Sequence, residues 1–200
     1  MTSIGQTAAY RTLCWVTRML WKWTGTIEVR GLEHLPKSGP CIVVANHESY
    51  LDPLLLQAFT PRVMHAMAKS TQFASRGMAW LMSLVYSFPV RRYQPDPIAV
   101  RTVLRLVAAG RAVMIYPEGE RSWDGRLQPL RRGTVRLLLK AGVPVIPCRI
   151  DGTYDAWPRW GKLVRGGHVT ITYKPALRLA ELSLAEATQV VESALGAPSV

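Results

Sequence analysis

Short apolar runs alternate with amphipathic helical patterns along most of the chain. We expect strands at residues 26–30, 41–45, 63–68, 86–90, 112–116, 143–150 and 168–173. Between several of these runs, and after the last, apolar residues recur at helical spacing, which predicts helices at residues 53–59, 71–83, 97–109, 134–141 and 184–195. Strands that alternate with helices are typical of an α/β domain. The pattern therefore predicts a mixed, largely parallel central sheet of about seven strands wrapped by helices.

The segment at residues 8–23 predicts an amphipathic helix. At about 100° per residue, Arg11, Arg18 and Lys22 fall on one narrow side and apolar residues fall opposite. The segment also contains three tryptophans, Trp15, Trp21 and Trp23. Such a helix could pack on the domain with its basic edge in water, but the tryptophans favour a membrane surface. We expect residues 1–25 to form a membrane-surface helix and residues 26–200 to form the main domain.

Composition indicates one folded domain with an anionic partner. The chain has 200 residues, of which 48% are hydrophobic, enough for a sizeable core. Lys and Arg total 25 against 13 acidic residues, a formal net charge of +12. Such a balance suits nucleic acid, an acidic membrane face or an anionic substrate, and charge alone does not choose among them.

The cysteines and the hydropathy pattern indicate the compartment. Cys14, Cys41 and Cys148 form no CxxC pair, which favours reduced thiols in the cytosol. No signal-peptide pattern is visible, because cations interrupt the apolar N-terminal segment. The uncharged run at residues 77–90 is too short to span a bilayer. We therefore expect a cytoplasmic protein bound peripherally to the inner face of the cell membrane.

A histidine and a carboxylate follow the apolar run at residues 41–45. His47 and Asp52 lie within reach of each other in the segment that leads to the expected helix at 53–59. Asp52 could orient the imidazole so that its other nitrogen takes a proton from a hydroxyl. An Asp directly before Pro53 is also a favourable helix start, with the Asp as N-cap, and His47 alone could be an ordinary loop histidine. Both interpretations are open at this point.

A second polar group follows the run at residues 112–116 and contains Glu118, Gly119, Arg121 and Ser122. Glycine allows close backbone approach, and arginine supplies a forked donor for phosphate. The alternative is a solvated basic turn, the commoner fate of charged segments.

Cationic residues also follow two other expected strands. Residues just past strand ends often converge on one crevice of an α/β sheet. On this basis we expect four strand ends to share a pocket, those of His47, Lys69, Arg92 and Arg121.

Four blocks of the sequence, in order, resemble the motifs of the glycerolipid acyltransferases, the family of 1-acylglycerol-3-phosphate acyltransferase. Asn46-His47 with Asp52 resembles NHxxxxD, and residues 116–122 (YPEGERS) resemble (F/Y)PEGTRS. Residues 88–92 (FPVRR) resemble the intervening arginine motif, and residues 143–147 (VPVIP) resemble the fourth, apolar block. The similarity runs from about residue 26 to 175.

The resemblance implies roles for these residues. His47 would be the general base on the acceptor hydroxyl, and Asp52 would orient it. The substrate, a lysophosphatidate, would be bound by a set of six residues: Lys69, Arg92, Glu118, Gly119, Arg121 and Ser122. An acyl thioester on coenzyme A or acyl carrier protein would be the co-substrate, phosphatidic acid the product, and no cofactor is implied. Residues 26–200 would be the acyltransferase domain.

One position departs from the family pattern. Glu120 replaces the usual threonine and adds a carboxylate beside the expected phosphate site. If it faced the phosphate, repulsion would weaken binding of a dianion, so a different lysolipid acceptor is an alternative. If Glu118 and Glu120 point to opposite sides, Glu120 could pair with a basic neighbour such as Arg131.

Other chemistries are less well supported by the residues. The histidines and cysteines show no zinc spacing, so we expect no metal. Cys41 could serve as a nucleophile, but its place inside an apolar strand favours a core residue. Two alternatives without catalysis stay open, a basic lipid-binding protein and a nucleic-acid-binding protein, although we expect no nucleic acid because no reader motif is present.

Overall fold

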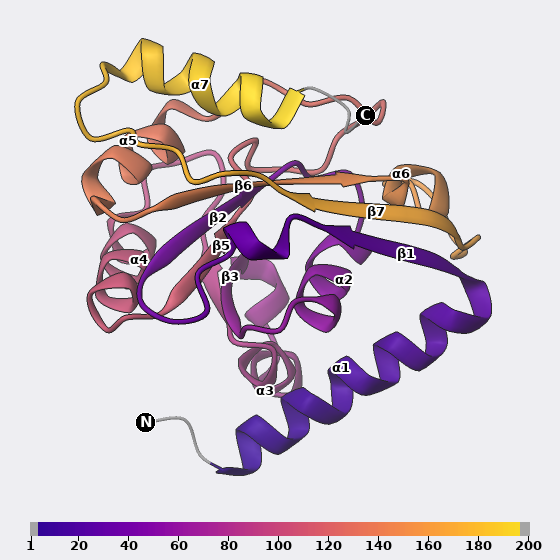
Figure 1. The fold of residues 1–200 in the computed structure, drawn as a ribbon. Helices are drawn as coiled ribbons and strands as arrows, with labels where there is room; N and C mark the ends of the chain where they lie inside the picture. The colour runs from indigo at the N-terminus through magenta and orange to yellow at the C-terminus, as the bar shows by residue number, and fades with distance from the viewer. Residues whose placement is uncertain (1–3, 197–200) are drawn as a thin grey trace.

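The computed structural model describes residues 4–196, which form a seven-stranded sheet with helices on both faces (Figure 1). The strands are β1 (Gly25–Arg30), β2 (Cys41–Ala45), β3 (Met64–Lys69), β4 (Ser87–Val90), β5 (Ala112–Ile115), β6 (Val145–Asp151) and β7 (Gly167–Tyr173). Their order across the sheet is β1-β7-β6-β2-β5-β3-β4. Because β6 and β7 pair antiparallel and every other pairing is parallel, β1 and β7 run against the other five. The predicted mixed, largely parallel sheet is confirmed.

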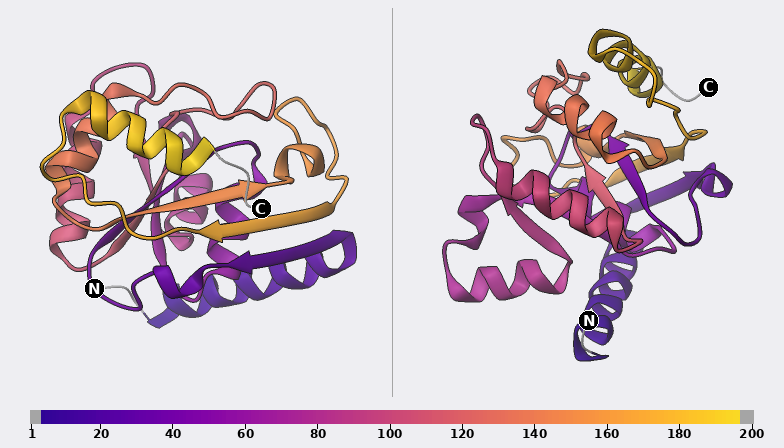
Figure 2. Two further views of the ribbon diagram at one scale, coloured as in Figure 1. Left: turned by 45° about the horizontal axis from the view of Figure 1, so that its top comes forward. Right: turned by 90° about the vertical axis from the view of Figure 1, so that its left-hand side faces the viewer.

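Two apolar clusters sandwich the sheet. On one face lie α4 (Pro97–Ala108), α5 (Arg132–Ala141) and α7 (Leu184–Gly196), which pack on Ile42, Val44 and their neighbours. On the other lie α1 (Ile4–Thr24), α2 (Leu51–Phe59) and the short α6 (Thr153–Ala156). Figure 2 shows α1 and α7 on opposite sides of the sheet. Strand β2 is central and entirely buried because successive side chains enter the two clusters in turn.

The carboxyl ends of the five parallel strands meet at one edge of the sheet. The central strand β2 leads into His47, and its neighbours β5 and β6 lead into Glu118 and Thr153. Strand β3 ends at Lys69, and β4 ends two residues before Arg92. In open parallel sheets this edge is where ligands bind. The strand order alone therefore brings the predicted site residues to one edge of the sheet.

The N-terminal helix is confirmed, but its faces differ from the expectation. The side buried on the domain is a stripe at helical spacing, with Tyr10 and Trp21 in the interior and Cys14 half-buried between them. Trp21 was expected at a lipid boundary; instead its indole Nε1–H donates to the carbonyl of Thr26 at 3.1 Å. Arg18 was expected on a free basic edge, but its Nε donates to the carbonyl of Ala58. The helix is thus anchored to the domain.

The expected helix at residues 71–83 is interrupted. Residues Ser70–Phe73 form a 3₁₀ turn, and α3 begins only at Arg76 and ends at Leu84. Ser75 caps the new start, because its hydroxyl accepts the backbone N–H of Met78 at 3.2 Å. Such side-chain capping favours a helix start over continuation of the preceding turn.

The division of the chain into residues 1–25 and 26–200 stays a prediction. Across residues 4–196 no helix combines the length and apolar character needed to cross a bilayer.

Candidate active site

His47 and Asp52 form a buried hydrogen-bonded pair after the central strand. The imidazole Nδ1 lies 2.7 Å from Oδ2 of Asp52, and both side chains are almost wholly enclosed. Because a carboxylate oxygen is an acceptor, Nδ1 carries the proton and donates it to this bond. The other ring nitrogen, Nε2, is then left with a free lone pair. The geometry gives His47 the tautomer that a general base requires.

Asp52 is held by four donors. Its Oδ2 also accepts the backbone N–H groups of Glu48 and Ser49 at 2.7 and 2.8 Å, and its Oδ1 accepts the hydroxyl of Thr153 at 2.6 Å. The interpretation of Asp52 as N-cap is wrong, since α2 begins at Leu51 and Tyr50 is the N-cap. The carboxylate turns back over the preceding loop instead of capping the helix forward. In this geometry the carboxylate fixes the orientation of the His47 ring through their hydrogen bond, while its catalytic role stays a prediction.

The surroundings of His47 keep its ring neutral. Burial lowers the pKa of His47 below its ordinary value of 6.5, and the nearby charges of Arg92 and Arg121 act in the same direction. The hydrogen bond and charge of Asp52 oppose this shift without reversing it. The ring also stacks on Tyr116, with centroids 4.0 Å apart and planes 19° from parallel. A neutral, fixed imidazole can accept a proton near neutral pH.

Residues of the second motif (116–122) form hydrogen bonds with the backbone of His47 in the first motif. Oε1 of Glu118 accepts the N–H of His47 at 2.7 Å, and Oε2 accepts the N–H of Gln128 at 2.7 Å. The N–H of Ser122 donates to the carbonyl of His47 at 2.7 Å. Burial raises the pKa of Glu118 to about 7, with the two backbone donors opposing the rise. Glu118 therefore lies within the protein beneath the loop that carries His47, and its substrate-binding role stays a prediction.

Gly119 and Ser122 also serve the shape of this loop. Gly119 has φ of 78°, and a Cβ there would meet Cγ of Arg131 at 3.1 Å, so both conformation and space favour glycine. Ser122 is fully buried, and its hydroxyl donates to the carbonyl of Arg126 at 2.7 Å. Neither residue lines the cavity described next. Their direct contact with substrate stays a prediction.

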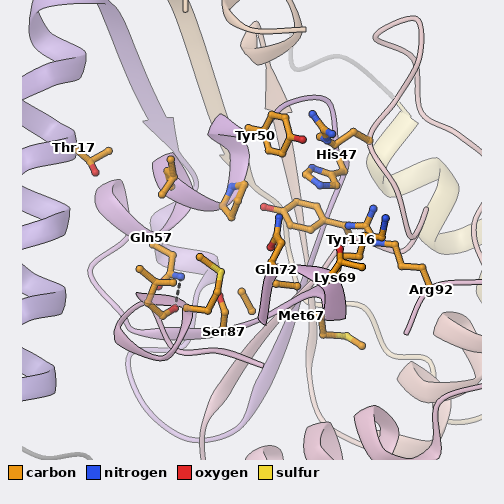
Figure 3. A pocket seen from close by; sticks show the side chains of 18 of the residues that line it. Thr17, His47, Tyr50, Gln57, Met67, Lys69, Gln72, Ser87, Arg92 and Tyr116 are labelled. Carbon is orange, nitrogen blue, oxygen red and sulfur yellow. Dashed lines mark hydrogen bonds between the residues drawn. The ribbon is translucent and has the colours of Figure 1, made fainter. Parts of the chain in front are cut away.

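A cavity of about 610 Å³ opens beside His47 (Figure 3). Its lining comes from α1, α2, β3, the 3₁₀ turn at Ser70–Phe73, the end of α3, β4 and the segments after β2, β4, β5 and α6. One end, near His47 and Tyr116, is cationic and holds four basic side chains: Lys69, Arg92, Arg121 and Arg159. The remaining wall is mainly apolar and includes Leu13, Leu54 and Met82. The cavity thus has a cationic end beside His47 and an apolar arm that leads away from it (Figure 3).

Arg121 has donor capacity to spare. Its Nη1 is buried and has no hydrogen-bond partner among the described residues, while its guanidinium lies 3.4 Å above the ring of Tyr50. Burial lowers the pKa of both Arg121 and Arg92, because charged groups lose hydration there. Buried cations without full pairing favour an anionic ligand. The expected convergence of His47, Lys69, Arg92 and Arg121 on one pocket is confirmed, while their roles toward substrate stay predictions.

Arg159 is a cavity residue that the sequence did not reveal. It lies in the segment between α6 and β7, and its Nη1 donates to Oε2 of Glu120 at 3.1 Å and to the carbonyl of Arg121 at 2.9 Å. Its guanidinium stacks 3.6 Å above Trp123. The segment around it contains Lys162 and Arg165 as well, and no spacing in the sequence distinguishes one of these cations from the others.

Glu120 faces basic side chains. Oε1 accepts from Arg131 at 3.2 Å, the pairing considered from the sequence, and Oε2 accepts from Arg159 and from the hydroxyl of Tyr93 at 2.9 Å. Burial would raise the pKa of Glu120, but the hydrogen bonds from Arg159 and Tyr93 and the neighbouring charges hold it below its ordinary value. Glu120 does not line the cavity. Its carboxylate instead forms ion pairs with Arg131 and Arg159.

The described residues contain no group of three or more His, Cys, Asp or Glu side chains placed to hold a metal ion. Cys41 is fully buried in β2 and belongs to the core, as expected. Burial raises the pKa of the Cys41 thiol, which disfavours the thiolate that a nucleophile needs.

Comparison with known proteins places the chain in a family. A family model described as Acyltransferase matches residues 26–151, more than half of the chain. The chain is 35% identical over 153 residues to a chloroplast 1-acyl-sn-glycerol-3-phosphate acyltransferase of Brassica napus (BAT2), which covers 74% of this chain and 44% of that protein. It is 28% identical over 129 residues to 1-acyl-sn-glycerol-3-phosphate acyltransferase of Bacillus subtilis, covering 64% of each. The chain thus spans less than half the length of the Brassica relative.

A solved structure agrees with these matches. The crystal structure of the 1-acyl-sn-glycerophosphate acyltransferase PlsC from Thermotoga maritima superposes with a TM-score of 0.82 at 25% identity, covering 95% of this chain and 78% of that one. The similarity extends beyond the matched motifs to the strands and helices that place them. The resemblance drawn from four short blocks of sequence is therefore confirmed, and the chain belongs to the acyltransferase family.

Proposed function

We propose that this protein transfers a fatty acyl group from an acyl thioester to the sn-2 hydroxyl of 1-acyl-glycerol-3-phosphate, which gives phosphatidic acid. The observation that carries the proposal is the neutral imidazole of His47, oriented by Asp52 at 2.7 Å, beside a cavity with a cationic end and an apolar arm. A lysophosphatidate has the matching chemistry, a phosphate near its reacting alcohol. The names of the matched relatives in Brassica and Bacillus support the same reaction.

The chain supplies a base, an orienting acid and cations for this reaction. Nε2 of His47 takes the proton of the acceptor hydroxyl while the oxygen attacks the thioester carbonyl carbon. The carbon–sulfur bond then breaks, and the departing thiolate takes the proton from Nε2 to leave as a free thiol. Asp52 stabilises the imidazolium between these two steps. The reaction needs no other reactant, since the acyl group and the single transferred proton are both accounted for.

The cationic end suits the phosphate of the acceptor. Arg121 offers an unpartnered Nη1, and Arg92 lies on the cavity wall with it. Arginine binds phosphate oxygens through two parallel donors. The pairing of Glu120 with Arg131 and Arg159 removes the repulsion that would have favoured an acceptor without phosphate. A lysophosphatidate is therefore proposed over other lysolipids.

Replacing the base tests the reaction. His47→Asn should lower kcat by about 10²–10⁴, measured as free thiol released from acyl-CoA in the presence of lysophosphatidate and as phosphatidic acid by mass spectrometry. The matched control is His168→Asn, an exposed histidine on β7. Full turnover in the His47 variant would overturn the assignment of the base. Activity confined to acceptors without a phosphomonoester would overturn the assignment of the acceptor.

We also propose that α1 binds the anionic inner face of the cell membrane. With Tyr10 and Trp21 buried, the helix leaves Trp15, Leu20 and Trp23 exposed, Trp23 by 90%. Aromatic and aliphatic side chains at a helix surface insert at the headgroup boundary, and a net charge of +12 favours anionic lipid.

Paired serine substitutions test this surface. Leu20→Ser with Trp23→Ser should weaken sedimentation with phosphatidylglycerol vesicles by roughly tenfold or more, because two apolar insertions are lost. Ile98→Ser is the control, since Ile98 is 62% exposed on α4, on the opposite face of the sheet. Equal vesicle binding by both proteins would contradict the role of α1.

A further inference from the structure

Helix α3 is strongly apolar but buries none of its residues. Five of its nine residues, Arg76–Leu84, are Met, Trp or Leu, and none of the nine is buried. The exposed fractions of Met78, Trp80 and Leu81 are 42%, 64% and 38%. A surface helix ordinarily buries its apolar stripe, and contiguous exposed apolar side chains mark an interaction surface. Helix α3 therefore presents a surface that the described residues leave uncovered.

The same helix has a second side, which faces the cavity. Met82 lines the cavity wall, whereas Trp80 and Leu81 do not. Trp80 precedes Met82 by two residues, so it lies about 200° around the helix from it. The contrast with α4 is clear, because α4 buries three residues at helical spacing: Ala99, Val103 and Val107. The outward side of α3, with Trp80 and Leu81, is thus separate from the substrate cavity.

The outward side of α3 has a neighbour of the same chemical character. Helix α3 contacts α1, and both helices lie on the side of the molecule away from α7 (Figures 1 and 2). Residues 4–27 and 53–95, which contain the two helices, include no Asp or Glu, although the chain has 13 acidic residues. Lys22 and Arg76 are exposed within these segments. Exposed tryptophan and leucine beside cations, without carboxylates, complement an anionic bilayer.

A second copy of the chain fits this surface less well than lipid does. In a two-fold symmetric contact the same patch lies on both sides of the interface. The cations around α3 would then face each other, with no carboxylate in residues 53–95 to pair with them. Anionic headgroups supply the opposite charge, and the acyl region below them accepts the apolar side chains.

We propose that α3 is a second membrane-binding helix, which inserts Trp80 and Leu81 into the headgroup boundary of an anionic bilayer beside α1. The inference rests on the proposed membrane binding by α1 and extends that contact to the segment after β3. Because Met82 lies on the other side of α3, one wall of the cavity then lies next to the lipid surface.

A fluorescent label on α3 tests the proposal. Leu81→Cys is prepared in a Cys14→Ala background, where the two remaining native thiols, Cys41 and Cys148, are buried. With phosphatidylglycerol vesicles, an environment-sensitive label at position 81 should shift its emission to the blue and brighten severalfold. The same label on Ile98→Cys, on α4, should stay in water. A label at position 81 that stays in water while the protein sediments with vesicles would overturn the role of α3 and leave that of α1.

Serine substitutions test the energetic contribution. Trp80→Ser with Leu81→Ser should weaken vesicle binding by roughly tenfold or more, and the fold should persist because α3 buries no residue. Trp80→Phe with Leu81→Met keeps the apolar character and should retain binding. Equal binding by the serine and the apolar variants would contradict the proposal. A blue shift at position 81 that depends on protein concentration and needs no lipid would assign the surface to a dimer instead.

Catalysis is measured separately from docking. Neither Trp80 nor Leu81 lines the cavity, so acyl transfer to a water-soluble short-chain lysophosphatidate should be the same in the serine variant and the native protein. Transfer to long-chain lysophosphatidate in vesicles should fall with vesicle binding. If the native protein forms no phosphatidic acid, the acyltransferase proposal fails, while the label and the sedimentation still decide the role of α3.

Discussion

Glu118 holds His47 by its backbone: Oε1 of the carboxylate accepts the His47 N–H at 2.7 Å, while its other oxygen accepts the N–H of Gln128 at the same distance. His47, on the loop after β2, is therefore positioned by a side chain on the loop after β5, the neighbouring strand. The two motifs, which lie far apart in the sequence, therefore meet because they follow adjacent strands.

Removing one of these acceptors should loosen the loop. In Glu118→Gln the amide NH₂ faces one of the two backbone donors, which leaves a buried N–H unpaired. We expect the free energy of unfolding to fall by about 1–3 kcal/mol, with kcat reduced more than KM is raised. Denaturant melts and steady-state kinetics measure both. Glu33→Gln, at a side chain that is 76% exposed, is the control; unchanged kcat and stability in the Glu118 variant would contradict the positioning role.

The acid limb of the pH profile should lie below the ordinary range of histidine. In the proposed mechanism His47 must be neutral to accept a proton, so activity should be lost as pH falls through the pKa of His47 in the folded protein. Burial and the charges of Arg92 and Arg121 lower the pKa of His47 beneath 6.5, which moves the loss of kcat/KM to more acid pH. Arg92→Gln removes one of these charges and should move the limb back toward neutral pH.

The control for this shift is the adjacent arginine. Arg91 is 52% exposed at its side chain and faces Asp96 at 3.9 Å rather than the cavity. Arg91→Gln should leave the acid limb in place. Identical limbs in the Arg92 and Arg91 variants would show that Arg92 does not act electrostatically on His47.

Thr153 should influence catalysis through Asp52. Its hydroxyl donates to Oδ1 of Asp52 at 2.6 Å in a fully buried position. Thr153→Val keeps the shape of the side chain and removes the donor, so kcat should fall roughly tenfold and stability should fall by about 1–3 kcal/mol. Thr153→Ser retains the hydroxyl and should recover most of kcat. A Ser variant as impaired as the Val variant would place the effect in packing rather than in the hydrogen bond.

Glu48 should make the fold less stable as pH rises. Burial, followed by the charge of Asp52, raises the pKa of Glu48 from 4.5 to about 8. Because the folded protein then binds more protons than the unfolded chain between these values, stability decreases across that window. Glu48→Gln mimics the protonated acid and keeps an oxygen to accept from Asn46 Nδ2, a bond of 2.9 Å in the native protein.

The variant should therefore melt a few degrees higher than the native protein above pH 8, since about 1 kcal/mol moves Tm by about 2–4 °C in a domain of this size. At pH values below the ordinary pKa of a carboxyl group, the two proteins should have the same Tm. Glu181→Gln, at an exposed residue, is the control. A difference in Tm that is the same at both pH extremes would argue against titration of Glu48.

The sequence predicts most of the sheet because burial on both faces leaves long apolar runs. Strand β2 is an example, since all five of its residues are apolar and buried. The same reasoning places His47, Lys69, Arg92 and Arg121 together, because parallel strand ends share an edge. The pairing of Glu120 with Arg131, which was considered from the sequence, also forms, although residues 117–120 make a turn with Gly119 at φ 78° and not an extended segment.

The local pattern of apolar and polar residues does not predict contacts between distant segments. Trp21 is a residue type common at membrane surfaces, yet it packs in the apolar cluster of the domain and its indole N–H donates to the carbonyl of Thr26. Asp52 has the sequence context of an N-cap. Its carboxylate instead accepts hydrogen bonds from His47, Thr153 and two backbone N–H groups of the preceding loop, so it does not cap the helix. Arg159 enters the site from a loop without regular periodicity. In each case tertiary hydrogen bonding decides what local preference leaves open.

Helix α1 contributes Tyr10, Leu13, Cys14 and Thr17 to the cavity wall while its opposite side faces outward. If the outward side of α1 binds the membrane, as proposed, one helix of 21 residues both attaches the protein and forms part of the cavity wall. A chain that starts at β1 would then lose its membrane contact and four residues of the cavity wall together.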